Sequence, residues 1–397
     1  MAEEDKKTAN TAEVRFPLLS SSPHIVSPVR SDRLMANMLI ALAPVTIFGI
    51  VLFGLSALLT VLVSVIAAVA GEALFRLATR QELRVRDLSA AVTGLLLALT
   101  LPPSTPFWMT ALGAVFAVVV AKEFFGGLGA NVFNPALAGR AFMLMSFPAA
   151  MTRWHRPPPG FAPALAEHLN ASSIVDGVSG VTPLNIAKIL AGENRLGEAV
   201  GAVGKDFLAA SGLNIPPDVS PDYWSAIKTL FIGDHAGAIG ESSVLLILAA
   251  CLVLLLTRTI DWRAPLAMTL AGLLASWALG YNPLFGIFSG GLLFGAVFMV
   301  TDYVTAPLTG KGKLIFGFGA GLITVLIRKW GSYPEGVTYG ILIMNALSPF
   351  LNRLLPRKYG SVPKKKPPAP GAPVSGAPAP KVPVSGSPAS GASKGAS

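Results

Sequence analysis

The chain has 397 residues, of which 52% are hydrophobic and only 13% are charged, and its formal net charge is +10. Soluble domains carry about a quarter charged residues, so this composition excludes an ordinary soluble protein. The basic residues lie in short loops between apolar runs and at both ends, which favours a membrane protein with no nucleic-acid partner. A single cysteine, Cys251, excludes an intrachain disulfide and an iron–sulfur cluster held by several thiolates.

Long apolar segments predict an all-α polytopic membrane protein with about ten transmembrane helices. The segments cover residues 34–55, 56–76, 88–102, 106–121, 137–150, 243–257, 264–281, 284–301, 314–328 and 337–351. Several are shorter than the ~20 residues that a straight span needs, so we expect them to extend into their flanks or to be broken helices packed inside protein. We expect no cleavable signal peptide, because residues 1–33 are polar and charged.

Every second loop is basic, which predicts that these loops and both termini are cytoplasmic. The long insertion then lies on the other side of the membrane. The predicted parts are a cytoplasmic arm at 1–33, helices at 34–150, an extracytoplasmic loop at 151–242, helices at 243–354 and a cytoplasmic tail at 355–397. The tail is basic and rich in Pro, Ala, Gly and Ser, so we expect it to be disordered; its lysines would suit anionic lipid headgroups.

Short sequence echoes suggest an internal repeat. Gly113–Phe116 recurs as Gly295–Phe298, and Thr93–Leu96 resembles Ala271–Leu274. Membrane carriers are often built from repeats with interrupted helices at matching positions. Matches of four common membrane residues also arise by chance, so both readings stay open.

The loop at 126–140 is unusual at a membrane boundary. Its glycines allow close backbone approach, and Asn134 and Arg140 offer polar groups beside an apolar wall. Such a loop would suit a planar, polar-edged ligand such as an isoalloxazine ring. The alternative is a re-entrant turn whose asparagines satisfy its own backbone.

Asp302, at the end of the eighth apolar segment, is a candidate for a cation path or for a hydrogen bond to a cofactor. The alternative is a helix-terminal residue that faces water. Lys122 and Glu123 are interpreted as a solvated pair at a helix end, and Glu241 as an acid in the first turn of a helix. The four histidines have no metal-ligand spacing, and no glycine pattern for NAD occurs, so we predict no metal site and no catalytic residue.

The segment Gly177–Pro183 indicates a turn that exposes two hydroxyls, Ser179 and Thr182. An enzyme that modifies a hydroxyl needs such an accessible segment. Loops with Ser, Thr and Gly are nevertheless common, so these residues alone favour an unmodified turn.

Taken together, dispersed motifs resemble one family: the flavin-bearing D subunit of the Rnf electron-transport complex and the B subunit of the sodium-pumping NADH:quinone reductase. The motifs, in chain order, are Thr93–Leu97 with Leu101–Pro103, Phe124–Gly129 with Asn134–Ala136, Asp176–Gly177 with Ser179–Thr182, Gly240–Glu241, Thr301–Asp302, Gly310–Lys313, Tyr333–Val337 and Met344–Ala346. The resemblance covers about Pro23 to Arg353.

This resemblance implies FMN bound as a phosphothreonine ester at Thr182, within a motif that includes Asp176, Ser179 and Gly180. It implies electron transfer between ferredoxin and NAD, coupled to Na⁺ or H⁺ translocation across the bacterial inner membrane. The implied partners are the flavin- and iron–sulfur-bearing subunits of the complex, and a flavin transferase for maturation. Family members can also hold a second, non-covalent flavin, riboflavin.

Three departures from the family pattern are Val181 before the acceptor, Tyr303 after the aspartate and Asn352 near the last helix. The short N-terminal arm and its Ser22-Pro23-His24 fit the Rnf protein better than the quinone-reductase one. The alternatives are the quinone-reductase B subunit and a solute or ion carrier without redox chemistry.

Overall fold

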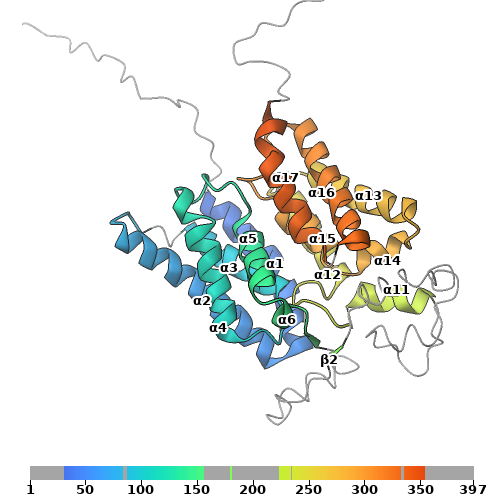
Figure 1. The fold of residues 1–397 in the computed structure, drawn as a ribbon, viewed down its shortest axis with the longest axis horizontal. Coiled ribbons are helices and arrows are strands. Elements are labelled where there is room, and N and C mark those ends of the chain that lie inside the picture. The colour runs from blue at the N-terminus through green and yellow to red at the C-terminus, as the bar shows by residue number, and fades with distance from the viewer. Residues whose placement is uncertain are drawn as a thin grey trace, which may run out of the picture. The chain divides into compact units, whose positions relative to one another are not determined.

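The computed structural model describes residues 31–83, 87–155, 179–180, 223–233, 235–331 and 335–353. The chain divides into two units, Met1–Leu354 and Leu355–Ser397, and every described residue belongs to the first. The described part of this unit is helical apart from one pair of two-residue strands (Figure 1). Asp176, Thr182 and the predicted tail lie outside the described residues.

The helices of the N-terminal half are α1 (Ser31–Phe53), α2 (Leu55–Ala78), α3 (Ser89–Thr100), α4 (Phe107–Val115), the π-helical turn η2 (Phe116–Val120), the 3₁₀ turn η3 (Glu123–Phe125), α5 (Pro135–Ser146) and α6 (Pro148–Met151). Those of the C-terminal half are α11 (Tyr223–Ile232), α12 (Val244–Leu256), α13 (Arg263–Ala278), α14 (Pro283–Phe288), α15 (Leu292–Phe294), the π-helical turn η4 (Gly295–Met299), α16 (Gly310–Trp330) and α17 (Val337–Asn352). Each apolar segment identified in the sequence contains a helix.

Two of the shorter helices, α5 and α14, begin with the same Asn-Pro pair. Asn134 caps α5 and Asn282 caps α14, and in both cases the amide oxygen accepts a hydrogen bond from a backbone N–H of the first turn and a proline follows. The eighth apolar segment is a broken helix, which is one of the two arrangements expected for a segment shorter than a full span. It is interrupted after α14, where Gly290 adopts φ 75°, a conformation that glycine reaches without strain.

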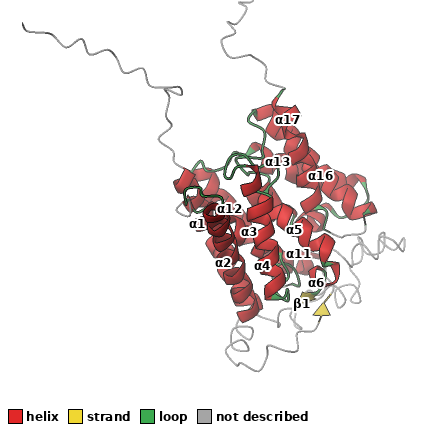
Figure 2. Cartoon of the chain, turned by 60° about the vertical axis from the view of Figure 1, so that its left-hand side comes forward, coloured by secondary structure: helices red, strands yellow, loops and turns green. Residues whose placement is uncertain are grey.

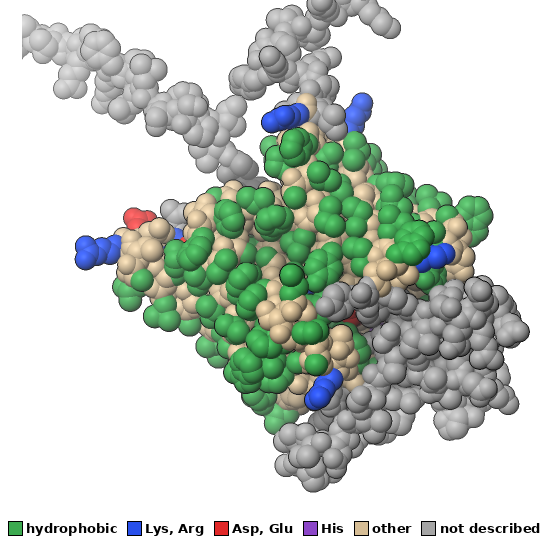
Figure 3. All heavy atoms as spheres, viewed as in Figure 1, with side chains coloured by type: hydrophobic (Ala, Val, Ile, Leu, Met, Phe, Trp, Pro, Cys, Tyr) green, Lys and Arg blue, Asp and Glu red, His purple; other side chains and the backbone are tan. Residues whose placement is uncertain are grey.

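Within the described residues, four helical stretches are long and apolar enough to cross a membrane: 31–53, 55–78, 107–125 and 310–330. Large apolar side chains such as Ile66, Leu256 and Trp277 are exposed on the helical bundle, and the face shown in Figure 3 is mostly hydrophobic with few charged groups. In water so much exposed apolar surface would drive association, whereas in a bilayer it faces lipid. The described residues therefore form an all-α membrane protein.

The two halves share a packing pattern. In the first, α2 packs against α3 and α4 (Figure 2). In the second, α13 packs against α14 and α16. The halves meet where α1 contacts α12 and α5 contacts α17. The residues Gly113–Phe116 and Gly295–Phe298 both lie at the start of, or within, a π-helical turn, η2 and η4. An internal repeat stays a prediction.

A short strand pair lies beside the helices. β1 (Trp154–His155) pairs antiparallel with β2 (Ser179–Gly180), so Trp154 lies opposite Gly180. Trp154 is buried in a small cluster with Ala236 and Ala238. The next residues continue inward, because the N–H of Gly240 donates to the Leu99 carbonyl at the end of α3. The pair therefore attaches β2 to the helical bundle.

Candidate functional site

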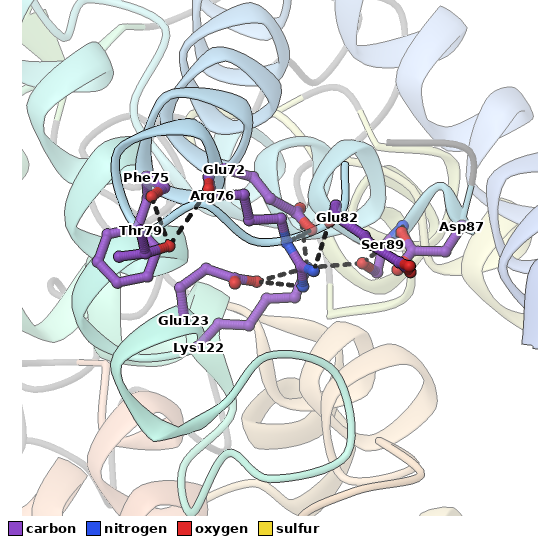
Figure 4. Close-up of polar contacts among 9 residues, drawn as sticks. All are labelled: Glu72, Phe75, Arg76, Thr79, Glu82, Asp87, Ser89, Lys122 and Glu123. Carbon is purple, nitrogen blue, oxygen red and sulfur yellow. Dashed lines mark hydrogen bonds and ion pairs between the residues drawn. The ribbon is translucent and has the colours of Figure 1, made fainter. Parts of the chain in front are cut away.

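Four charged side chains form a buried cluster between α2 and the turn that follows η2. The Lys122 ammonium lies 2.9 Å from Glu72 Oε2, and Arg76 lies 3.1 Å from Glu123 Oε1 and 3.3 Å from Glu72 Oε1 (Figure 4). None of the four side chains is more than 5% exposed. With two cations and two carboxylates the cluster is neutral, which is the condition for burying charge in a membrane protein.

The interpretation of Lys122 and Glu123 as a solvated pair is wrong. Their partners, Glu72 and Arg76, lie about one turn apart on α2, some fifty residues earlier in the chain. Adjacency in sequence therefore concealed the pairing. A signal was available, because Glu72 stands within a predicted transmembrane segment, where an ionisable residue indicates function or a buried partner.

The cluster extends to the start of α3 through Ser89. The Ser89 hydroxyl accepts a 2.6 Å hydrogen bond from the Lys122 ammonium and donates a 2.7 Å hydrogen bond to Asp87 Oδ1. Asp87 is partly exposed at the rim. Lys122 thus has two strong contacts, one with a carboxylate and one with a hydroxyl.

A cavity of about 50 Å³ lies against this cluster. Its polar lining residues are Ser89, Thr93, Lys122, Asn131, Asn134, Asp302 and Tyr303. Apolar groups, among them Met38, Leu96 and Phe298, complete the wall. The cavity therefore brings together α1, α3, the loop that precedes α5, and the turn that follows η4.

Asp302 is half-buried on the wall of this cavity, so it lies neither fully in water nor fully in the interior. Its Oδ2 accepts a 2.9 Å hydrogen bond from the Thr305 hydroxyl. The backbone N–H groups of Tyr303 and Val304 also donate to this carboxylate. Among the described residues Asp302 has no ion-pair partner. Its roles in an ion path or in cofactor contact stay predictions.

The two asparagines of the glycine-rich loop mainly satisfy local backbone. Asn134 Oδ1 accepts from the N–H of Leu137, and Asn131 Nδ2 donates to the Phe133 carbonyl. Asn134 Nδ2 also reaches the Met299 carbonyl in η4, at 3.4 Å. These contacts support the interpretation of a turn, yet both residues also line the cavity.

Arg140 lies in α5, away from the cavity wall, in a second charged cluster. It contacts Glu335 directly and lies 3.9 Å from Glu241 Oε1. Glu241 is 4% exposed and packs under Gly291, where the broken helix resumes. The interpretation of Glu241 as a simple first-turn acid is therefore wrong, because its carboxylate faces Arg140 in the interior.

Arg328, on α16, completes the support of the broken helix. Its guanidinium donates to the carbonyls of Gly286 and Ser289. Because α14 ends at Phe288, carbonyls at this helix end need partners outside the helix. Nothing in the structure places Arg140 beside Asn134 at one ligand. Ser179 and Gly180 lie in β2, and the other predicted attachment residues, Asp176 and Thr182, lie outside the described residues.

The described residues allow one test of flavin binding, which is the size of the cavity at Asp302. Pockets that enclose a drug-sized molecule usually measure roughly 300–1,000 Å³. The cavity at Asp302 measures about 50 Å³, which suits a few waters or one cation rather than an isoalloxazine ring. The residues that line it therefore do not fit a flavin in this form of the protein. In the described part of the chain no group of three His, Cys, Asp or Glu residues could hold a metal ion.

Fold and buried charges together define a helical membrane protein with ionisable clusters inside its helical bundle. Residues 18–360 match the model of the NQR2, RnfD, RnfE family, and the chain belongs to that family. It is 38% identical over 351 residues to the D subunit of the proton-translocating ferredoxin:NAD(+) oxidoreductase complex of Clostridium ljungdahlii, covering 86% of this chain and 96% of that protein.

Two further relatives have similar coverage. The chain is 39% identical over 352 residues to the D subunit of the ion-translocating oxidoreductase complex of Stutzerimonas stutzeri, covering 85% and 94% of the two chains. It is 37% identical over 348 residues to the D subunit of the Na(+)-translocating ferredoxin:NAD(+) oxidoreductase complex of Acetobacterium woodii, covering 88% and 96%. The identification of the Rnf D-subunit family from sequence motifs is confirmed.

Proposed function

We propose that this chain is the flavin-bearing D subunit of an ion-translocating ferredoxin:NAD oxidoreductase complex, with FMN attached to Thr182. Family membership over nearly the whole helical region is the observation that carries the proposal. The relatives are named as D subunits of such complexes, which makes this chain a subunit of a translocase rather than a self-sufficient enzyme. Its partners are the other subunits of that complex.

The proposed topology has about ten membrane spans with both termini in the cytoplasm of a bacterial cell, and the loop at 151–242 outside the inner membrane. The basic loops support this orientation. The strand pair supports the proposal that the attachment site lies close to the helical bundle. β2 is paired with β1, and Val181 and Thr182 follow β2 directly in the sequence. A flavin transferase would act on this loop.

FMN, when attached, supplies one- and two-electron redox chemistry. The chain's own contribution is to hold the phosphate ester on the Thr182 hydroxyl, so that the group is not lost from the outer face. Moving one charge against the membrane potential costs about 2.3 kcal/mol per 100 mV, and electron transfer must supply it. The proposed ion path includes the cavity at Asp302, whose polar wall lies between the two halves of the chain.

The relatives differ in the ion that their names state, a proton in one and Na⁺ in another. Either ion fits a cavity of about 50 Å³ lined by a carboxylate, hydroxyls and amides. A second flavin, riboflavin, would have to bind elsewhere, or widen this cavity by moving its walls apart.

The decisive test is in-gel fluorescence of the denatured chain, purified from a host that has the flavin transferase. We expect a fluorescent wild-type band, a dark band for Thr182→Ala and a fluorescent band for the matched control Ser179→Ala. A dark wild-type band, or fluorescence that survives Thr182→Ala, would contradict the attachment site.

The same preparation separates the alternatives. A quinone-reductase B subunit would co-purify with subunits that reduce quinone and would not respond to ferredoxin. A carrier without redox chemistry would be colourless and would transport its solute with no electron donor.

A further inference from the structure

The strand β1 is held in place by two contacts with the helical bundle. The Trp154 side chain is 4% exposed and packs in a cluster with Ala236 and Ala238, whose small side chains leave room for the indole. One residue earlier in the chain, the carbonyl of Arg153 accepts a 3.0 Å hydrogen bond from the Ser104 hydroxyl, in the connection between α3 and α4. These two contacts give β1 a defined place at the end of the bundle.

The cluster that holds Trp154 belongs to a buried segment, residues 235–243, which lies between α11 and α12. Its backbone is non-helical and is bonded to the end of α3, because the N–H of Gly240 donates to the Leu99 carbonyl at 2.7 Å. A Cβ at Gly240 would lie 2.7 Å from the Leu99 Cβ, so the two backbones are in close contact. Non-helical backbone is stable inside a membrane protein only where such partners exist. The segment therefore gives Trp154 a firmly packed surface.

The strand pair itself is too short to be stable alone. Each strand has two residues, with Trp154 opposite Gly180 and His155 opposite Ser179. Isolated strand pairs are marginally stable at best in water, so this pair depends on the packing of Trp154. Thr182 follows Gly180 by two positions, and two residues span at most about 7 Å. The anchored strand therefore limits where the Thr182 hydroxyl can lie.

We propose that Trp154 positions the flavin-bearing segment. Its buried indole keeps β2 on β1 throughout turnover, so that electrons reach and leave the flavin while the segment is docked beside the end of α3. The alternative is a segment that leaves the bundle and carries the flavin between two partners. This inference rests on the proposed attachment of FMN to Thr182. A covalent tether alone prevents loss of the flavin, whereas electron transfer between fixed centres also needs a defined position.

The test locks the strand pair with an engineered disulfide in the purified complex. In the background Cys251→Ala, His155→Cys/Ser179→Cys places two thiols at residues that lie opposite each other. Opposite residues of an antiparallel pair are about 4.5–5.5 Å apart between Cα atoms, which a disulfide can bridge. A polyethylene-glycol maleimide, added before or after reduction, measures the bridged fraction on a denaturing gel. The matched control is His155→Cys/Gly180→Cys, because adjacent positions of a strand point to opposite faces.

We expect the disulfide to form, and the bridged complex to transfer electrons from reduced ferredoxin to NAD as fast as the same complex does after the disulfide is reduced. Trp154→Ala in this background should shift the pair toward its open form at least about tenfold, because a large buried side chain is lost. Disulfide formation should then slow, and the unbridged complex should transfer electrons more slowly. Forming the bridge should restore the rate, and Trp154→Phe should retain most of it.

A bridged complex that is slower than its reduced form would overturn the proposal, because the segment would then have to leave β1 during turnover. Unchanged disulfide formation, or unchanged electron transfer, in Trp154→Ala would overturn it too. Equal bridging in the control pair would show that the strands are not held in this register, with the same consequence.

If Trp154→Ala fails to assemble, Trp154→Leu gives the same comparison with a smaller loss of contact. Disulfide formation needs no flavin, so it stands apart from the fluorescence test. A dark wild-type band would refute the attachment to Thr182, whereas the rates of disulfide formation would still decide whether Trp154 anchors β2.

Discussion

At the scale of residues, the contacts of Arg140 depend on parts of the chain that are far apart in sequence. Its partners, Glu241 and Glu335, precede α12 and α17. The loop motif around Asn134 indicated polar groups near a membrane boundary but not these carboxylates. Sequence motifs report what is adjacent along the chain, whereas buried ion pairs form between elements. For this reason the sequence favours a solvated pair of Lys122 and Glu123, whereas the structure buries both.

Removing Arg140 should destabilise the protein strongly. Arg140→Met leaves the buried Glu241 and the half-buried Glu335 without this ion-pair partner, and breaking a buried pair costs about 3–5 kcal/mol. We expect a clear fall in the thermal midpoint of the detergent-solubilised chain, and partial recovery in Arg140→Met/Glu335→Gln. Arg153→Met, at an exposed arginine, is the control and should unfold like the wild type. Equal midpoints for Arg140→Met and this control would refute the buried pairing.

A second residue-scale prediction concerns pH. Burial alone would raise the pKa of Asp261, but hydrogen bonds from Lys313 and the Arg263 backbone, and both cations, lower it. A lowered folded-state pKa means that the pairing stabilises the protein above the unfolded pKa of about 3.9 and is lost as pH falls through the folded value. Because Asp261 is partly exposed, we expect less than about 1 kcal/mol.

This loss should appear as a small fall in thermal midpoint when the pH is lowered from 5 toward 3. Asp261→Asn should lower the midpoint at pH 5 and reduce the pH-dependent part. If the variant retained the full wild-type pH dependence, other carboxylates would be responsible.

At the scale of elements, α2 and α3 approach so closely that a glycine is required. A Cβ at Gly94 would lie 2.8 Å from the Ser64 carbonyl oxygen and 2.9 Å from the Ala68 Cβ. The Ser64 hydroxyl also donates a 2.7 Å hydrogen bond to the Gly94 carbonyl. The sequence predicted both helices from their apolar runs, but helix periodicity alone does not determine which glycine lies at the crossing.

Gly94→Ala should therefore destabilise the helix pair by about 1–3 kcal/mol, because backbone must move apart. Gly71→Ala, on α2, is the matched control, since its Cβ would meet side-chain atoms of Val115 at an ordinary 3.5 Å. Comparing the yields and thermal midpoints of the two variants checks the prediction. A Gly71→Ala variant more damaging than Gly94→Ala would place the crossing elsewhere.

At the scale of the whole molecule, composition and apolar runs were sufficient to predict an all-α membrane protein, because the bilayer demands long apolar helices. For the segments too short to span, they predicted either extension into the flanks or a break, and the eighth segment is broken. They did not predict the charge clusters, since every member is paired with a residue from another element. The loop at 151–242 and the attachment residue Thr182 remain predictions.

The predicted orientation can be checked by cysteine labelling in the background Cys251→Ala. Gln81→Cys, after α2, should react with a membrane-impermeant maleimide only after the cells are opened. Thr152→Cys, after α6, should react in intact cells, because both sites are exposed but lie on opposite sides of the predicted membrane. The reverse labelling pattern would invert the topology and place the loop at 151–242 in the cytoplasm.

The two π-helical turns have a consequence for insertions and deletions. In each, one N–H skips a residue, so that Ala121 bonds to the Phe116 carbonyl and Val300 to the Gly295 carbonyl. Each turn thus holds one residue more than an α-helix needs. Deleting one residue from Phe116–Val120 would therefore convert this turn into regular α-helix and leave later side chains such as Lys122 on their present face. The same deletion in a regular helix would rotate every later side chain by about 100°, so we expect one-residue deletions to be tolerated better here than in the middle of α2.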